Sequence, residues 1–368
     1  MKKSSVDADS PLEAEAKRVE LTVSCLDCAE LPKVGDAGQL IDVDGVPAQV
    51  MHNGVLVEPG GYFGDWMAEI IRRLKGHHEP QEELVFARVL ERLCDAASPR
   101  PTAIELGSFW AYYSLWFLND IPQGSVLAME PEPDRLDLGQ RNFKLNGRTG
   151  QFIEGVVGPE PGVELAFTQE SNGKVRKVQQ YDLAMLMRTA DFDHVDLLLC
   201  DVQGGESHFF TQSETLLRSG AVRFAIISTH HHSISGDPLT HQKLLEFFSR
   251  IGAHIIAEHT VGESFSGDGL IAVAFDKSDA DLVVHTSFNR QGAGIYPALE
   301  FDLAAEKAHV GALQLATEQL GRQLAEKTAQ LATSATKLKQ TRKRLNALEN
   351  SRAVRYSNRT KRLLDRRS

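Results

Sequence analysis

Residues 102–131 constrain the fold of this chain more than any other stretch. An apolar strand runs into Glu105-Leu106-Gly107, a helix follows, and a second apolar strand ends at Glu130, which is the order and spacing of a nucleotide-binding strand–helix–strand unit. Gly107 would let the backbone approach a ligand where a Cβ would collide, and Glu130 stands where a carboxylate accepts hydrogen bonds from a ribose diol. The stretch predicts a site for an adenosine-like cofactor, with an ordinary buried strand–turn–helix as the alternative.

The residues after Gly107 narrow the choice of cofactor. Phe109 and Ala111 stand where dinucleotide enzymes have further glycines, which let a pyrophosphate lie on the helix N-terminus. A ligand without phosphate fits this turn better. S-adenosylmethionine is such a ligand, with a ribose diol for Glu130 and an amino-acid end for the turn of Glu105 and Gly107.

Two later segments place acidic and imidazole side chains at the same edge of the predicted sheet. A buried strand ends at Asp201, and the strand over 225–228 runs into Thr229-His230-His231-His232. The carboxyl ends of parallel strands meet at one edge, where ligands bind. A histidine titrating near neutral pH can take the proton of an alcohol beside a carboxylate, or the same groups can bind a divalent cation such as Mg²⁺. At most two of the three histidines can face the site from an extended strand end.

Three motifs in this order resemble those of the FkbM-type O-methyltransferases, a family of S-adenosylmethionine-dependent enzymes. They are Glu105-Leu106-Gly107-Ser108-Phe109-Trp110-Ala111-Tyr112-Tyr113-Ser114, then Met129-Glu130-Pro131, then Asp201-Val202-Gln203-Gly204-Gly205-Glu206. Phe109 replaces the family Asn, Ala111 the second Gly, and Gln203 the Glu of the third motif. The resemblance covers residues 80–285 and implies an α/β fold, a Rossmann-like class I methyltransferase sheet that is mostly parallel with about seven strands.

The residues and the resemblance together predict an O-methyltransferase acting on a hydroxyl of a small molecule, a sugar or a surface glycan. The catalytic residues are predicted to be Asp201, His230 and His231, with Asp201 and His230 as ligands if a divalent cation is used. The cofactor-binding residues are predicted to be Glu105, Gly107, Ser108, Glu130, Pro131, Val156, Asp201 and Gln203. The alternative is a catalytically inactive methyltransferase-fold scaffold that assembles partners through its C-terminal helix.

The chain divides into five predicted segments. Residues 1–78 form a small β-rich region, with short apolar runs from 19–23 onward and a glycine-rich aromatic lid or core segment over 60–67. Residues 79–285 alternate strands and helices, with an inserted hairpin at 163–178 and a helix over 181–187. A linker over 286–304, a coiled-coil helix over 305–350 and a basic tail over 351–368 follow.

Composition places the chain among globular proteins of a reducing compartment. Its 42% apolar content supports a substantial core, and neither a secretion signal nor a membrane-spanning stretch is recognisable. The four cysteines lack a repeating framework, which favours the cytoplasm. Cys25 and Cys28 have the C-x-x-C spacing of half a zinc site, but Cys94 and Cys200 supply no second pair, so the spacing is interpreted as coincidence. A metal there would require histidines from elsewhere, such as His77 and His78.

The C-terminal segment predicts assembly. Leu324, Leu331, Leu338 and Leu345 recur every seven residues, which is typical of a coiled coil and indicates a homo-oligomer, while a long solvated helix is the alternative. From residue 337 onward, 12 Lys and Arg stand against two acids, so this end carries +10 and the rest of the chain −20 within the total of −10. We expect the basic tail to dock on a protein partner or the inner membrane face rather than on nucleic acid.

Overall fold

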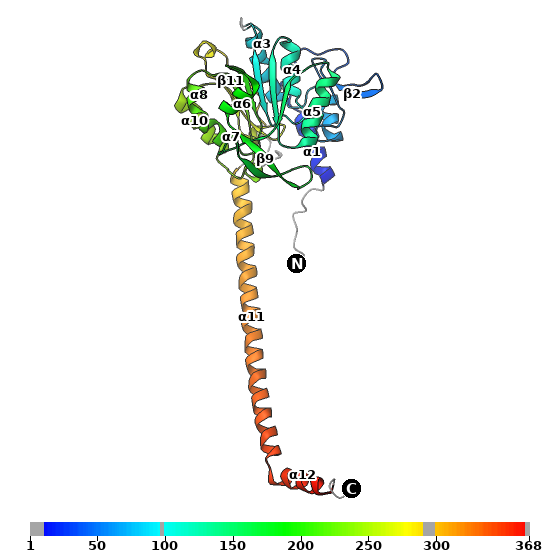
Figure 1. The fold of residues 1–368 in the computed structure, drawn as a ribbon, viewed down its shortest axis with the longest axis vertical. Helices are drawn as coiled ribbons and strands as arrows, with labels where there is room; N and C mark the ends of the chain where they lie inside the picture. The colour runs from blue at the N-terminus through cyan, green and yellow to red at the C-terminus, as the bar shows by residue number, and fades with distance from the viewer. Residues whose placement is uncertain (1–10, 96–98, 290–298, 365–368) are drawn as a thin grey trace. The chain divides into compact units, whose positions relative to one another are not determined.

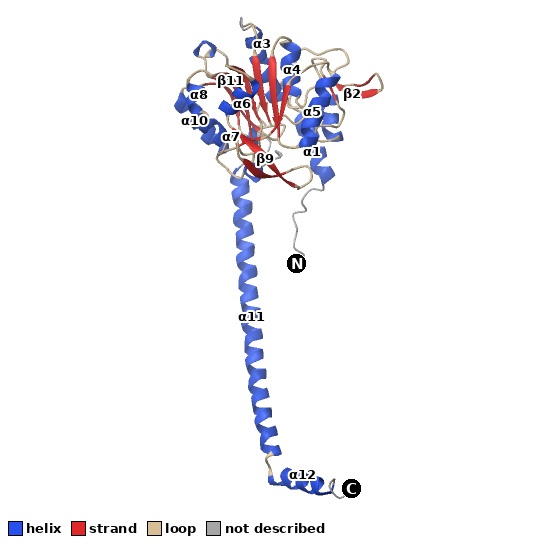
Figure 2. Cartoon of the chain, viewed as in Figure 1, coloured by secondary structure: helices blue, strands red, loops and turns tan. Residues whose placement is uncertain are grey.

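The computed structural model describes residues 11–95, 99–289 and 299–364. The chain forms two compact units, Met1–Pro297 and Ala298–Ser368. The first contains a seven-stranded sheet between helices and the second is helical in its described part (Figure 1, Figure 2).

The N-terminal region contains a helix before its small sheet. The apolar run over 19–23, which the sequence placed in the β-rich region, instead ends helix α1 (Pro11–Val23), whose Ala, Glu, Lys and Leu content favours helix. The antiparallel sheet that follows is β1 (Leu40–Val43), β2 (Val46–Val50) and β3 (Leu56–Val57). Helix α2 (Asp65–Arg73) comes next and packs on α1.

The central sheet has the strand order β12-β13-β11-β10-β4-β5-β6. Its strands are β4 (Thr102–Leu106), β5 (Ser125–Glu130), β6 (Gln151–Glu154), β10 (Val195–Cys200), β11 (Val222–Thr229), β12 (His254–His259) and β13 (Gly269–Ala274). Neighbours pair in parallel except around β13, which is antiparallel to both β11 and β12. The mostly parallel α/β sheet is therefore as predicted. The chain order reverses between β4 and β10, which is where open α/β sheets bind ligands.

Two hydrophobic cores lie on the two faces of this sheet. Successive residues of one strand alternate between them, as Leu197 and Leu199 join one core and Leu198 the other. The first core is covered by α1, α2, α3 (Pro80–Cys94), α4 (Tyr112–Asp120) and α5 (Pro133–Leu145), and the second by α6 (Leu183–Ala190), α7 (Glu206–Gln212), α8 (Glu214–Arg218) and α10 (Thr240–Ile251). Burial on both faces explains why these strands read as continuous apolar runs.

The inserted hairpin is present, as β8 (Glu164–Thr168) antiparallel to β9 (Val175–Tyr181), with β7 (Val156–Val157) on its other side. The predicted helix over 181–187 starts too early. Tyr181 still belongs to β9, because the carboxylate of Asp182 accepts a hydrogen bond from the Met185 amide at 2.7 Å and so caps α6 at Leu183. Short elements complete the unit: α9 (His232–Ser235), η1 (Val261–Glu263) and η2 (Lys277–Asp279).

The second unit consists of helix α11 (Leu299–Glu349) and helix α12 (Arg352–Leu364). Helix α11 takes in residues 299–304 of the predicted linker, because this stretch is made of helix-forming residues; residues 290–298 lie outside the described part. No helix among the described residues combines the length and the apolar character needed to cross a membrane.

Candidate active site

A cavity of about 500 Å³ lies at the carboxyl ends of β4, β5, β10 and β11. All of the predicted cofactor-binding residues line it, namely Glu105, Gly107, Ser108, Glu130, Pro131, Val156, Asp201 and Gln203. His230 lines it as well. The strand-end rule therefore brings together residues that are almost one hundred positions apart in the chain.

Glu130 ends β5 with its carboxylate fixed by the backbone. Its two oxygens accept hydrogen bonds from the amides of Phe109, at 3.1 Å, and Glu132, at 3.0 Å. The side chain is buried, and burial raises the pKa of Glu130 to about 7. Each carboxylate oxygen keeps a lone pair for a further donor, which suits the two hydroxyls of a ribose.

Position 107 needs glycine because a neighbouring strand lies close to it. The sequence predicted instead that glycine lets the backbone approach a ligand. The φ of Gly107 is +77°, and a Cβ there would lie 1.7 Å from the backbone oxygen of Asp201. The absent side chain thus lets the ends of β4 and β10 approach each other. The next residue, Ser108, has a buried hydroxyl with no hydrogen-bond partner among the described residues. Because buried polar groups are normally paired, this hydroxyl indicates a polar ligand atom in the cavity.

The three departures from the family motifs share one backbone property. Phe109, Ala111 and Gln203 have φ of +41°, +57° and +56°, in the left-handed region that Gly and Asn adopt most readily. The family Asn and Gly at the first two positions suit this backbone, and the present chain keeps the backbone without them. The ring of Phe109 instead lies under the guanidinium of Arg135, 4.2 Å from its centroid.

Glu105 has a structural contact at the cavity wall. Its buried carboxylate accepts a hydrogen bond from the Ser114 amide at 3.0 Å, which ties the end of β4 to the first turn of α4. Burial raises the pKa of Glu105 to about 7.

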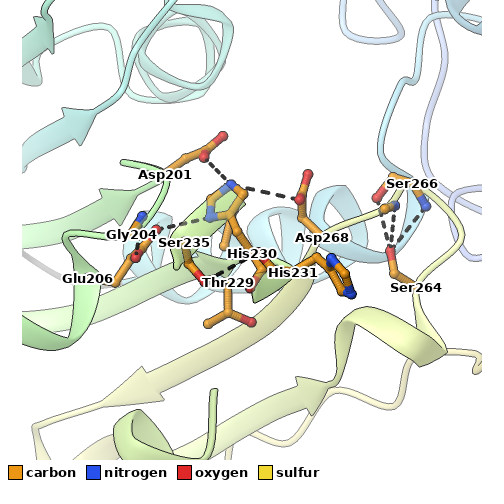
Figure 3. A network of polar contacts seen from close by, with 12 residues as sticks. Asp201, Gly204, Glu206, Thr229, His230, His231, Ser235, Ser264, Ser266 and Asp268 are labelled. Atoms are coloured by element: carbon orange, nitrogen blue, oxygen red, sulfur yellow. Dashed lines mark hydrogen bonds and ion pairs between the residues drawn. The ribbon is translucent and has the colours of Figure 1, made fainter. Parts of the chain in front are cut away.

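His230 lies at the centre of a carboxylate network (Figure 3). Its Nε2 is 2.9 Å from Asp201 and 3.8 Å from Asp268, and its Nδ1 is 3.0 Å from Glu206. Burial alone would lower the pKa of His230, but the charge of Asp268 and the hydrogen bonds to Asp201 and Glu206 outweigh burial and hold it well above its usual value. With a carboxylate at each ring nitrogen, His230 is an imidazolium.

This arrangement bears on both predicted catalytic histidines. Both ring nitrogens of His230 face carboxylates, so we interpret His230 as a residue that positions its acidic neighbours, while its predicted role as a base or metal ligand stays a prediction. His231 does not line the cavity, because it caps the short helix α9, where its Nδ1 accepts a hydrogen bond from the Ser233 amide at 3.3 Å. The expectation that at most two of the histidines join the site is consistent with this placement.

The cavity contains acids that sequence reasoning missed. Glu79 and Glu82 reach it from the start of α3, and Asp268 reaches it from the turn before β13. Burial raises the pKa of Asp268 to about 6, against the lowering effect of His230. Asp268 precedes its strand rather than following one, but β13 is antiparallel, so its beginning lies at the edge where β11 ends. The Gly-Asp-Gly turn at 267–269 was the available signal.

Aromatic side chains from the predicted lid segment form one wall. Tyr62 and Phe63 line the cavity together with Phe109 and Trp110. The Tyr62 and Trp110 rings are stacked, with centroids 4.5 Å apart. Trp66 is not part of this wall and packs against the first core, under the guanidinium of Arg18. The segment is thus both a wall of the cavity and a part of the core.

Fold and site together define a Rossmann-like methyltransferase domain. Residues 94–255 match the family model of the methyltransferase FkbM domain. A search of curated proteins finds no match.

Solved methyltransferase structures resemble the chain at low identity. The METTL16 MTase domain is 13% identical, with 54% of this chain and 69% of that chain covered and a TM-score of 0.37. Precorrin-6y C5,15-methyltransferase from Geobacter metallireducens GS-15 is 15% identical over 51% of this chain and 86% of that chain, with a TM-score of 0.33. M. capricolum TrmK in complex with S-adenosyl-homocysteine is 11% identical over 53% and 74%, with a TM-score of 0.32.

Proposed function

We propose that this chain is an S-adenosylmethionine-dependent O-methyltransferase. The observation that carries the proposal is that two sets of polar groups line one cavity, and we assign one half of the cavity to each set. The first set is Glu130, with its backbone-fixed carboxylate, and the unpartnered hydroxyl of Ser108. The second set is Asp201, Asp268 and His230. The first half suits a ribose-bearing cofactor and the second suits a hydroxyl that must lose a proton.

When bound, the cofactor would supply an electrophilic methyl group on a sulfonium sulfur. The acceptor hydroxyl would attack this carbon, so that an oxygen–carbon bond forms, the sulfur–carbon bond breaks and the hydroxyl proton leaves. In this proposal Asp201 or Asp268 accepts that proton, while the imidazolium of His230 holds both carboxylates in place. Most of the rate would come from alignment of the two reacting groups in the cavity.

The acidic lining of the second half favours a neutral, hydroxyl-rich acceptor. Carboxylates at Glu79, Asp201 and Asp268 accept hydrogen bonds from hydroxyls and repel phosphate or carboxylate groups. A sugar ring of a glycan or of a secondary metabolite has this chemistry, and it is the acceptor class that we propose. The same lining would also accept a divalent cation such as Mg²⁺, which would need the carboxylates alone because His230 is engaged.

The first experiment separates an enzyme from an inactive scaffold. Calorimetry with S-adenosylhomocysteine should give saturable binding, and labelled methyl transfer from S-adenosylmethionine into cell-extract fractions should label a neutral product. Chelator treatment followed by Mg²⁺ add-back should leave transfer unchanged if the carboxylates act as bases. A protein that binds neither cofactor nor product would be the scaffold of the alternative hypothesis.

We further propose that α11 makes the protein a homo-oligomer. Leu324, Leu331 and Leu338 form one stripe of this helix and are 70% or 71% exposed within the single chain. Pairing with a second copy would bury this stripe. Deleting residues 305–368 should convert a dimer or larger assembly to a monomer in light scattering and leave S-adenosylhomocysteine affinity unchanged. A full-length protein that is already monomeric at micromolar concentration would contradict the proposal.

Helix α12 would then present its basic face to an anionic membrane. Arg355, Arg359 and Arg362 recur on one side of this helix, with no acid between residues 352 and 364. Flotation with vesicles containing phosphatidylglycerol should retain the full chain, and neutral phosphatidylcholine vesicles should not. Equal behaviour with both would leave docking to a protein as the remaining explanation of the charge.

A further inference from the structure

A second cluster of histidine, carboxylate and thiol groups lies in the first unit, outside residues 94–255. Ligand atoms of Cys28, His77 and Glu83 all lie within 4.8 Å of one another, and all three side chains are buried. They come from three separate segments: the turn after α1, the loop before α3, and the first turn of α3. The thiol of Cys28 is 3.9 Å from Oε2 of Glu83.

Buried polar atoms around the cluster have no hydrogen-bond partner among the described residues. These atoms are Nε2 of His77, Nε2 of His52 and the hydroxyl of Tyr112. The rings of His52 and His77 are stacked, with centroids 4.1 Å apart. Nδ1 of His52 lies 3.1 Å from the Pro32 oxygen, so when it donates there its Nε2 carries a free lone pair. Two buried imidazoles with unused nitrogens beside a thiol are unusual in a closed core.

The backbone fixes these groups in place. Gly76 has a φ of +89°, and a Cβ there would lie 2.1 Å from the backbone nitrogen of His52, so this close approach needs glycine. One carboxylate oxygen of Glu83 accepts a hydrogen bond from the amide of His78 at 2.9 Å and also contacts the Nδ1 of that residue. The other oxygen, Oε2, faces His77 and Cys28. A carboxylate held by one oxygen and presenting the other is typical of a metal ligand with its supporting partner.

We propose that Cys28, His77 and Glu83 bind a zinc ion, with His52, whose ring stacks on that of His77, as a candidate for a fourth ligand. Thiolate, imidazole and carboxylate together are a zinc donor set. Zinc bond lengths place neighbouring ligand atoms about 3.5 Å apart, which is close to the present separation of thiol and carboxylate. The two negative charges of the thiolate and Glu83 balance Zn²⁺, so a sealed site can hold the ion.

The proposed ion would fasten the N-terminal segment to α3. This helix begins beside Glu79 and carries Glu82, and both residues line the active-site cavity. Zinc at this position is therefore a structural element that sets the acceptor side of the cavity without touching it. Because the site is sealed, the ion would enter during folding and be retained through purification.

The test is metal analysis of the full chain purified without chelator. Wild type should contain about one zinc per chain, and Cys28→Ser and His77→Ala should each lose most of it. Cys94→Ser is the matched control, because Cys94 is exposed and remote from the cluster, and it should keep the zinc. Circular dichroism of each variant shows whether it is folded.

A second measurement uses wild-type protein alone. Refolding in Co²⁺ should give the near-ultraviolet thiolate-to-cobalt charge-transfer band and the visible bands of a four-coordinate ion. A folded wild-type protein without zinc and without the cobalt bands would overturn the proposal and leave a metal-free hydrogen-bonded cluster. Zinc that is retained equally by a folded Cys28→Ser variant would also overturn it.

Discussion

The two clusters of histidine and carboxylate side chains in the first unit differ in how far they line the cavity. His230 touches three carboxylates and lines the cavity, whereas Glu83 and His77 are buried outside its lining. Of the second cluster, His78 contacts Glu83 and also lines the cavity. Similar side chains therefore have different roles in the two clusters. In the open cluster, carboxylates remain for a ligand that enters through the cavity, whereas the buried groups of the closed cluster, with the zinc ion proposed for them, contribute to stability.

The largest expected effect is on the stability of the closed cluster. Glu83→Gln removes the charge that both histidines contact, and breaking a buried ion pair costs about 3–5 kcal/mol in the free energy of unfolding. Urea denaturation measures the change. Glu214→Gln is the control, because Glu214 pairs with Arg218 and Arg250 at the surface, and its loss should change the midpoint little. Equal effects of the two variants would remove the distinction between closed and exposed pairs.

The second-largest expected effect is a loss of methyl transfer when the open cluster is changed. Asp268→Asn keeps the shape of the side chain and removes its ability to take a proton, so labelled methyl transfer should fall by about 10²-fold or more. S-adenosylhomocysteine affinity and the unfolding midpoint should stay close to wild type. His230→Gln should give a smaller loss of transfer, since His230 positions the acids. Asp281→Asn, at an exposed carboxylate, is the control. Full transfer by Asp268→Asn would assign the proton to Asp201 alone.

A pH dependence should distinguish the cofactor half of the cavity. Burial raises the pKa of Glu130 to about 7 in the free protein, so the folded chain binds more protons than the unfolded chain between about pH 4.5 and pH 7. Glu130 therefore costs stability as the pH rises through this window. Ribose hydroxyls need the ionised carboxylate, so S-adenosylhomocysteine affinity should rise up to about tenfold per pH unit toward pH 7 and level off above it.

Glu130→Gln tests this assignment by calorimetry across pH 5.5 to 8. The variant should bind about 1–3 kcal/mol more weakly at pH 8, because one oxygen acceptor is replaced by an amide donor, and its affinity should vary less with pH. Glu154→Gln is the matched control, since Glu154 ends the neighbouring strand in register with Glu130 but pairs with Arg176. A Glu130→Gln variant with unchanged affinity would end the ribose assignment.

The sequence predicted more of the open cluster than of the closed one. Glu130, Asp201 and His230 follow parallel strands, and the rule that ligands bind at strand ends needs only local patterns. The rule did not predict Asp268, because Asp268 precedes a strand that is antiparallel to its neighbour. The charge state of His230 could not be predicted either, because Glu206 and Asp268 reach it from positions 24 residues before and 38 after it. Cys28 and Glu83 meet only through the packing of α1 against later elements, which no local pattern encodes.

The smallest expected effect concerns the backbone at the start of α4. Ala111 has φ of +57° at the start of α4 and is fully buried. Ala111→Gly removes left-handed strain of about 1–2 kcal/mol, and it loses about 0.8 kcal/mol of methyl burial and up to about 1 kcal/mol through the greater freedom of the unfolded chain. The free energy of unfolding should therefore change by less than about 1 kcal/mol.

Ala128→Gly provides the comparison that makes this result informative. Ala128 is also fully buried, but it lies in β5, where its extended backbone carries no left-handed strain to relieve. Ala128→Gly removes a buried methyl group and also gives the unfolded chain more conformational freedom. Its free energy of unfolding, measured by urea denaturation, should therefore fall by at least about 1 kcal/mol more than that of Ala111→Gly. Equal losses at the two positions would show that the left-handed turn at Ala111 is not strained. The turn before α4 would then keep its left-handed backbone without a conformational penalty.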